Sequence, residues 1–270
     1  MTTHTQKSNA FRRRFLLALC LLQVFLLPAQ VVNTEKLRVD AQEDGWAHQG
    51  TFGLSLSRNK AGQLLGIGLR LRSEYHAGRH RLLWVGDYAR TRLQSDDAGS
   101  ILVKNIRNEG FVHLRYNYRF QPWLTWEAFV QSQFNEIQAM RYRQLQGTGP
   151  RFRLIDRDSV HVFLGTLYMF EYEETTDGTP FMFHRDHRLS SYLSAGFAFS
   201  PTASLNHVTY FQPRLDQWSD FRLSSESILS VALTTHIQLN VSFNLVYDTQ
   251  PPLGIPRTMY NLSNALALRW

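Results

Sequence analysis

Arginine at alternate positions is the chemical pattern that recurs most often along this chain. The guanidinium group stays charged and forms paired hydrogen bonds with carboxylates and small anions. Arginines outnumber lysines 25 to 4. A face on which arginine dominates would favour anions, whereas arginines matched by acids would fill and stiffen an interior with ion pairs. We predict that one interior face carries Arg70, Arg72, Arg115, Arg119, Arg141, Arg143, Arg151, Arg153, Glu127, Glu171 and Glu173.

Serines and histidines raise a second possibility, which is lipid hydrolysis. A serine nucleophile needs a histidine base in reach and a third polar group that orients the histidine. No H-x-S-x-G arrangement occurs, and the histidines are scattered. We therefore expect no catalytic residue and keep a lipid-active hydrolase as an alternative. The residues available to such a site are Ser132, Ser191, Ser225, Ser227, His113, His161, His207 and His236.

Metal, cofactor and nucleic-acid sites have little support. The single cysteine, Cys20, excludes a Cys-x-x-Cys metal site and an internal disulfide. The run from His184 to His187 holds two histidines and Asp186, but Arg185 would oppose a cation. Basic residues do not cluster, and no nucleic-acid-binding motif is present. We expect no metal, no cofactor and no nucleic-acid partner.

The elements that must position these side chains are β-strands. From about residue 50 onward, apolar and polar residues alternate with period two, which is typical of strands with one apolar face. Ile67, Leu69 and Leu71, for example, alternate with glycine and arginine. About twelve such segments are predicted, near 50–58, 63–74, 79–91, 110–120, 123–134, 138–154, 159–173, 187–200, 203–213, 219–233, 236–248 and 258–270.

Segment and connection lengths favour a membrane barrel. Most segments exceed the roughly 9–11 residues that a tilted strand needs to cross a bilayer. Short turns alternate with longer connections at 92–109, 174–186, 214–218 and 249–257, as in outer-membrane barrels. The mean hydropathy is −0.29, and no apolar run of about 20 residues follows residue 32, which excludes a bundle of transmembrane helices. We predict an all-β fold, an antiparallel transmembrane β-barrel of about 12 strands. A secreted β-sandwich is the alternative.

The amino terminus has the features of an export signal. Three arginines, Arg12 to Arg14, precede an apolar stretch from Phe15 to Leu27, which is the order found in secretory signals. An uncleaved membrane anchor is the alternative. Removing this segment lowers the net charge from +7 to about +3. We predict a signal peptide at 1–30, a periplasmic linker at 31–48 and the barrel at 49–270.

The last predicted strand runs to the carboxyl terminus and ends in an aromatic residue. Leu266, Leu268 and Trp270 fall on one face, an arrangement similar to the signal by which outer-membrane barrels are recognised for assembly. Phenylalanine is the more usual final residue, so Trp270 is a mild departure. We expect the protein in the bacterial cell outer membrane. Its expected partners are outer-membrane lipids, the barrel-assembly machinery and the export machinery.

Four segments carry a family resemblance: RYNYRFQPWLTWEAFVQSQFN (115–135), RYRQLQGTGPRFRLI (141–155), TYFQPRLDQWSDFRL (209–223) and NLVYDTQPPLGIPRT (244–258). They resemble the family called domain of unknown function 481, which includes the salt-induced outer-membrane protein of enteric bacteria. The stretch GWAHQGTFGLSLSRN (45–59) is similar to the start of that domain. The resemblance implies an exported outer-membrane β-barrel. It implies no established activity, so no catalytic residue is carried over.

Three functions remain open at this point. The first is non-enzymatic: a small barrel with a structural or stress-related role in the envelope and a largely filled interior. The second is a narrow anion-preferring channel, with small anions passing an arginine-lined lumen. The third is the lipid-active hydrolase.

Overall fold

The computed structural model describes residues 44–59, 62–97, 100–176 and 182–268. Within these ranges the chain forms twelve strands and one turn of 3-10 helix, η2 (Glu136–Gln138). The strands are β1 (Gly45–Asn59), β2 (Gly62–Ala77), β3 (His80–Asp97), β4 (Ser100–Gln121), β5 (Leu124–Asn135), β6 (Met140–Arg157), β7 (Val160–Thr175), β8 (Met182–Ser200), β9 (Ala203–Pro213), β10 (Phe221–Ala232), β11 (Ile237–Asp248) and β12 (Thr258–Leu268). None of the helical structure in these ranges has the length and apolar character needed to cross a membrane.

Several predicted features lie outside the described residues. These are the signal peptide at 1–30, the linker up to residue 43, and Trp270. Leu268 ends β12, but its side chain is not described. Of the predicted assembly signal, the structure therefore describes the side chain of Leu266 alone, which is about half exposed.

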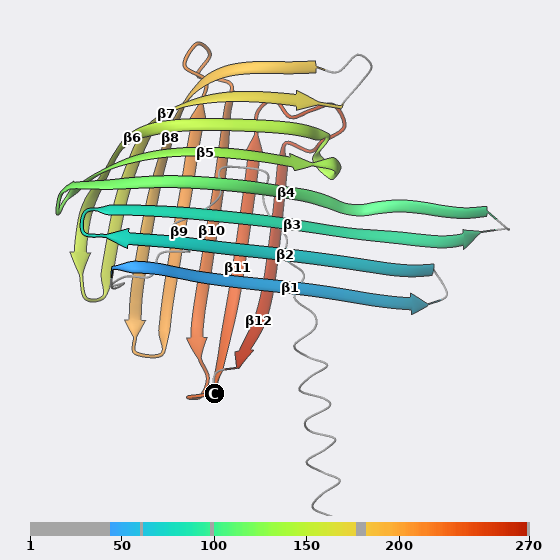
Figure 1. Ribbon diagram of the computed structural model, residues 1–270, viewed down its shortest axis with the longest axis horizontal. Coiled ribbons are helices and arrows are strands. Elements are labelled where there is room, and N and C mark those ends of the chain that lie inside the picture. The colour runs from blue at the N-terminus through green and yellow to red at the C-terminus, as the bar shows by residue number, and fades with distance from the viewer. Residues whose placement is uncertain (1–43, 60–61, 98–99, 177–181, 269–270) are drawn as a thin grey trace, which may run out of the picture.

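All twelve strands belong to one sheet, in which each strand pairs antiparallel with the next along the chain (Figure 1). This confirms the predicted all-β, antiparallel, twelve-stranded fold. Several boundaries differ from the prediction, two of them at the first strands. β1 begins at Gly45, inside the segment expected as linker. The segment 92–109, expected as a loop, continues the β3–β4 hairpin up to the pair Asp97 and Ser100. Strand pairing uses backbone groups, so it continues where the alternation of side chains fades.

The two faces of the sheet have opposite character. On β4, His113 and Arg115 are 0% and 2% exposed, while Val112 and Leu114 are 48% and 43% exposed. Successive side chains of a strand point to opposite faces, so the polar residues line the inside of the curved sheet and the apolar ones its outside. The inside also holds a small apolar cluster: Phe129, Leu145, Leu167, Met169, Tyr192, Val208 and Tyr210. A water-soluble protein distributes its residues the other way round.

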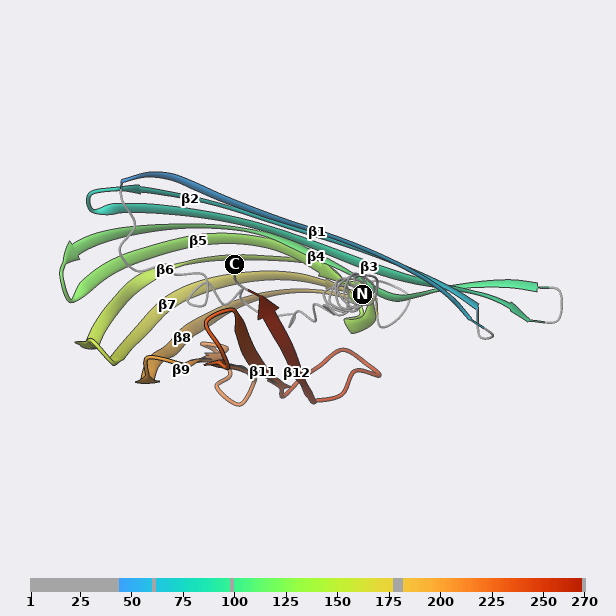
Figure 2. The same ribbon diagram turned by 90° about the horizontal axis from the view of Figure 1, so that it is seen from below.

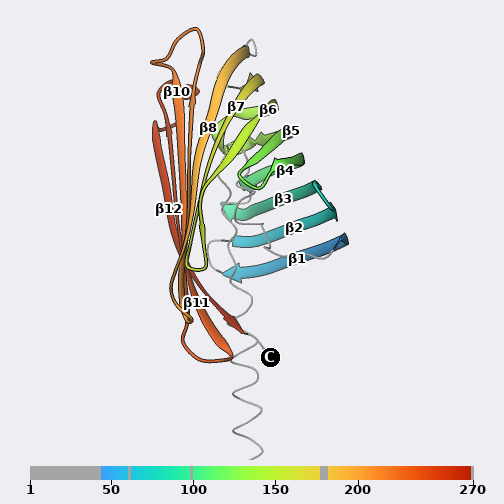
Figure 3. The same ribbon diagram turned by 90° about the vertical axis from the view of Figure 1, so that its left-hand side faces the viewer.

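The sheet curves strongly but its edges stay apart. β1–β4 run across the direction of β9–β12 (Figure 1), and the sheet forms an open trough when seen from the other two sides (Figures 2 and 3). Among the described residues, β1 pairs with β2 and β12 with β11, and no pairing joins β1 to β12. The pairing that would close the predicted barrel is therefore not made among the described residues. Each strand is rotated against its neighbour by roughly 20–25°, and over twelve strands these rotations turn the two edges into different directions (Figure 1).

Candidate functional site

Glu171 lies at the centre of the polar interior. It is on β7, is fully buried, and faces three arginines from three different strands. The Nε atoms of Arg143 on β6 and Arg188 on β8 lie 2.6 and 2.7 Å from its carboxylate oxygens. Arg222 on β10 forms a third ion pair with it. One carboxylate thus ties together three consecutive strands, β6 to β8, and β10.

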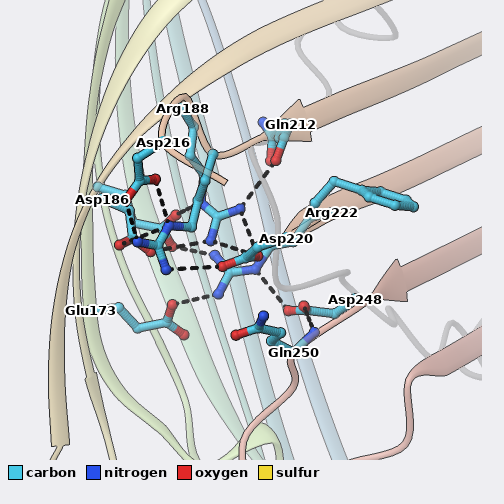
Figure 4. A network of polar contacts seen from close by, with 12 residues as sticks. Glu173, Asp186, Arg188, Gln212, Asp216, Asp220, Arg222, Asp248 and Gln250 are labelled. Carbon is cyan, nitrogen blue, oxygen red and sulfur yellow. Dashed lines mark hydrogen bonds and ion pairs between the residues drawn. The ribbon is translucent and has the colours of Figure 1, made fainter. Parts of the chain in front are cut away.

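The same arginines reach further acids (Figure 4). Arg222 donates to Glu173 and to Asp248, each at 2.7 Å. Arg188 donates to Asp186 at 3.2 Å and to Asp220 at 3.3 Å. A further bond of 3.1 Å runs from Arg188 to the carbonyl oxygen of Gln212 on β9.

Arg214 extends the network into the connection between β9 and β10. Its guanidinium donates to both carboxylate oxygens of Asp216, at 3.1 and 2.7 Å, and to Asp220 at 3.2 Å. It also lies 3.6 Å from Asp186. The hydrogen bond from Arg214 holds the pKa of Asp216 below its ordinary value. This connection is therefore fastened to the strands by charge.

We call these residues the Glu171 network, and its acids outnumber its arginines. The arginines are Arg143, Arg188, Arg214 and Arg222, and the acids are Glu171, Glu173, Asp186, Asp216, Asp220 and Asp248. The sequence had led us to expect an interior in which arginine exceeds acid. That expectation missed Asp216, Asp220 and Asp248, which lie in connections or at a strand end rather than within the alternating segments. The only signal for them was their presence in the quoted family-like segments.

The connection between β11 and β12 covers one end of the Glu171 network. Pro251, Pro252 and Ile255 line a cavity together with Arg143, Glu173, Arg222 and Asp248. This cavity measures about 30 Å³, which is the volume of about one water molecule. The charges beneath the connection are therefore packed against protein.

A second carboxylate, Glu127 on β5, is also fully buried. Tyr192 on β8 donates to it at 2.7 Å, and Arg115 on β4 donates at 3.3 Å. Arg151 on β6 lies 3.9 Å away and stacks over the Phe163 ring. These contacts connect β5 with β8 across the interior.

Further interior charges lie on the first strands. Glu74 is buried and forms ion pairs with Arg72 and Arg81, and lies 2.6 Å from His76. Arg70 pairs with Asp87 at 2.5 Å. Arg70 and Arg72 therefore face acids and lie on the inside of the sheet.

Three of the eleven predicted interior residues are more exposed than the others. Arg141 is exposed and 3.9 Å from Glu174, because the register of β6 against β7 shifts between Met140 and Tyr142 and displaces it. Arg119 and Arg153 lie near the turns at the strand ends, where Arg119 is exposed and Arg153 half-buried. A bulge in the β4–β5 register follows Arg119. Parity reveals neither the bulge that displaces Arg141 nor the position of Arg119 and Arg153 at the strand ends.

One serine–histidine pair meets among the residues considered for hydrolysis. His207 on β9 and Ser227 on β10 lie 2.8 Å apart through Nδ1 and Oγ, and Nε2 of His207 is 2.9 Å from the Thr209 hydroxyl. These side chains alternate with the buried Val208 and Glu226, so they lie on the outer face. The third partner is a hydroxyl, which orients the ring without stabilising an imidazolium charge.

Within the described ranges, no three histidine, cysteine, aspartate or glutamate side chains come together as metal ligands would. His187 instead stacks against Tyr168, with 5.8 Å between ring centroids.

Comparison with known proteins places the chain in a family. The family model described as "Protein of unknown function, DUF481" matches residues 37–270. The chain belongs to the DUF481 family. The match includes all twelve strands and agrees with the resemblance seen in the sequence. No curated protein matches the chain.

Two solved structures are similar in shape to this DUF481 protein. The NanC porin is 8% identical, with a TM-score of 0.45 over 83% of this chain and 99% of the porin chain. A bacterial polysaccharide outer membrane secretin is also 8% identical, with a TM-score of 0.40 over 83% of this chain and 89% of the secretin chain.

Proposed function

We propose that this protein is a non-enzymatic outer-membrane β-barrel with a structural role in the envelope, and that ion pairs fill its interior. The observation that carries the proposal is the reversed distribution of residues. Leu, Val and aromatic side chains are exposed on the outside, while charged side chains such as Glu171 and Arg143 are buried inside. Lipid would cover the apolar face, because charge there costs about 2–4 kcal/mol at the membrane midplane.

Membrane fractionation tests the location. We expect the protein in the outer-membrane fraction, and we expect its gel mobility to change on heating, because a folded barrel resists detergent. Recovery as soluble periplasmic protein would overturn the proposal and favour the secreted β-sandwich.

The filled interior distinguishes this role from the anion-preferring channel. Each arginine of the Glu171 network faces at least one carboxylate, so little positive charge remains within this network to attract anions. We expect no discrete conductance steps in planar bilayers. Anion-selective steps that change in Arg143→Ala, which alters the network, but not in Arg141→Ala, which alters an exposed neighbour, would establish the channel instead.

The stress-related part of the role rests on the resemblance to the salt-induced protein. A strain without the gene should survive high salt less well than its parent, and the wild-type gene should restore survival. Equal survival of the two strains at every salt concentration would remove this part of the proposal.

Lipid hydrolysis is a second candidate, favoured by the 2.8 Å contact between Ser227 and His207. Purified protein incubated with phospholipid would release fatty acid, and Ser227→Ala would abolish the release. Ser225→Ala is the matched control, because Ser225 shares the strand face and contacts Thr209 rather than His207. No release above a heat-killed sample would end this candidate.

A further inference from the structure

Three arginines gather at the short-turn end of the sheet, away from the Glu171 network. Arg79 lies in the turn between β2 and β3, Arg119 near the end of β4, and Arg153 near the end of β6. The three hairpin ends follow one another at the left of Figure 1. Backbone hydrogen bonds of 2.9 Å from Arg119 to Arg79, and from Arg153 to Trp123, join these ends to each other. The arginines are therefore carried on a hydrogen-bonded frame.

These side chains enclose a pocket of about 270 Å³, which we call the arginine pocket. It is lined by Arg79, Arg119, Phe120, Gln121, Pro122 and Arg153. Its volume is about nine times that of the cavity beside the Glu171 network. The arginine pocket has room for a small polyatomic group.

Charge in the arginine pocket is poorly balanced by acids. Within the described residues, the Arg79 guanidinium makes no hydrogen bond or ion pair. Arg119 donates to the carbonyl oxygen of Gly78 at 3.2 Å. Arg153 pairs with Asp156, whose other oxygen lies 2.7 Å from His161. Three positive charges thus meet one carboxylate, which is the reverse of the Glu171 network.

Aromatic side chains stand beside the arginine pocket. Phe120 lines it and is exposed, and the exposed Trp123 stacks on Phe152 with 6.3 Å between ring centroids. Exposed aromatic rings next to basic side chains are typical of the boundary between lipid tails and headgroups. Arginine is the side chain best suited to phosphate, because its planar group can donate two parallel hydrogen bonds.

We propose that the arginine pocket binds a phosphate group, carried by an anionic phospholipid or free in solution. The lipid source rests on the proposed outer-membrane location, in which short turns face the periplasm and therefore the inner leaflet. Basic pockets at a membrane surface bind anionic headgroups in this way.

Native mass spectrometry of the purified full chain in a non-ionic detergent tests the proposal. The probes are phosphatidylglycerol, phosphatidylcholine and inorganic phosphate. We expect phosphatidylglycerol to bind, and Arg79→Gln with Arg119→Gln to weaken its binding about tenfold. Arg90→Gln with Arg92→Gln is the matched control, because these exposed arginines lie on β3 toward its opposite end. Heat-modifiable mobility verifies that each variant is folded.

The outcomes separate the two sources of phosphate. Competition by inorganic phosphate assigns the site to the phosphate group itself, and binding without such competition assigns it to the lipid headgroup. Equal binding to wild type and the Arg79–Arg119 variant, or equal loss in the control variant, would overturn the proposal. Binding in detergent does not depend on cellular location, so its failure is distinguishable from a failure of the fractionation experiment.

Discussion

Among single residues, Glu171 has the most demanding environment. A carboxylate without access to water is costly to bury, and here three guanidinium groups compensate it. Glu171 in turn compensates buried positive charge, because Arg143 and Arg188 are about as buried as Glu171 and pair with the same carboxylate. Loss of Glu171 removes one ion pair from each of three buried arginines.

Glu171→Ala should therefore destabilise the protein by about 3–5 kcal/mol, the usual cost of removing one partner from a buried ion pair. Chemical unfolding followed by tryptophan fluorescence measures this free energy. Glu174→Ala is the matched control on the same strand. Glu174 is less buried and lies 3.9 Å from the exposed Arg141, so its loss should cost at most about 1 kcal/mol. Equal effects of the two substitutions would show that the Glu171 network contributes no special stability.

At the scale of elements, the close approach of β6 and β7 depends on glycine. A Cβ atom at Gly149 would overlap the carbonyl oxygen of Thr166 on β7, and backbone atoms cannot move aside as a flexible side chain could. At Gly68 on β2, a Cβ atom would meet nothing within 4 Å. Gly149, in the family-like segment 141–155, thus has a packing reason.

Gly149→Ala should disturb assembly of β6 against β7 and reduce the folded fraction, whereas Gly68→Ala should leave it unchanged. The measurement is the ratio of heat-modifiable to unfolded bands after refolding into detergent. If both variants refold to the wild-type ratio, the backbone at Gly149 has more freedom than the structure indicates.

The connection 214–220 is the element whose attachment depends on pH. Arg214 lowers the pKa of Asp216, so the stabilisation from this pair is complete above the ordinary aspartate pKa of about 3.9. It is lost as the pH falls through the lowered value. Asp186 and Asp220 also face Arg214 and add further contacts to it.

Limited proteolysis with an acid-active protease should therefore cut this connection only at strongly acidic pH. Asp216→Asn should allow cleavage at higher pH, because the ion pair between Arg214 and residue 216 is then absent at every pH. Asp158→Asn, in the exposed turn after β6, is the control and should leave the pH profile unchanged. An unchanged profile in Asp216→Asn would mean that Asp186 and Asp220 alone fasten the connection.

For the whole molecule, the decisive property is whether lipid or water covers the apolar outer face of the sheet. Leu114 on β4 is well exposed. In water, replacing an exposed leucine by arginine is close to neutral, whereas on a lipid-covered face it carries a large cost. The same substitution therefore distinguishes a membrane barrel from a soluble sheet.

Leu114→Arg should destabilise the protein in lipid vesicles by about 2–4 kcal/mol. Leu253→Arg is the control, because Leu253 is 80% exposed in the connection between β11 and β12 and should cost at most about 1 kcal/mol near the membrane surface. Denaturant titration in vesicles measures both values. A neutral Leu114→Arg would mean that lipid does not cover this face.

The sequence alone predicted the twelve strands, their antiparallel order and the polar side of most of them. It did so because alternation is a local property: side chains of a strand point in turn to opposite faces whatever the strand's neighbours are. Residues at bulges were the exceptions. Arg141 has the same parity in the sequence as Arg143 but does not share its inner face. The extra residue of a bulge turns a side chain away from the face that simple alternation predicts.

Tertiary structure alone decided which charges meet. Glu171 gathers arginines from β6, β8 and β10, and Asp220 and Asp248 join them from beyond the alternating segments. These partnerships, the arginine pocket and the separation of β1 from β12 depend on how far the whole sheet curves and twists. Curvature sums small rotations over all twelve strands, so the pattern of a single segment does not contain it.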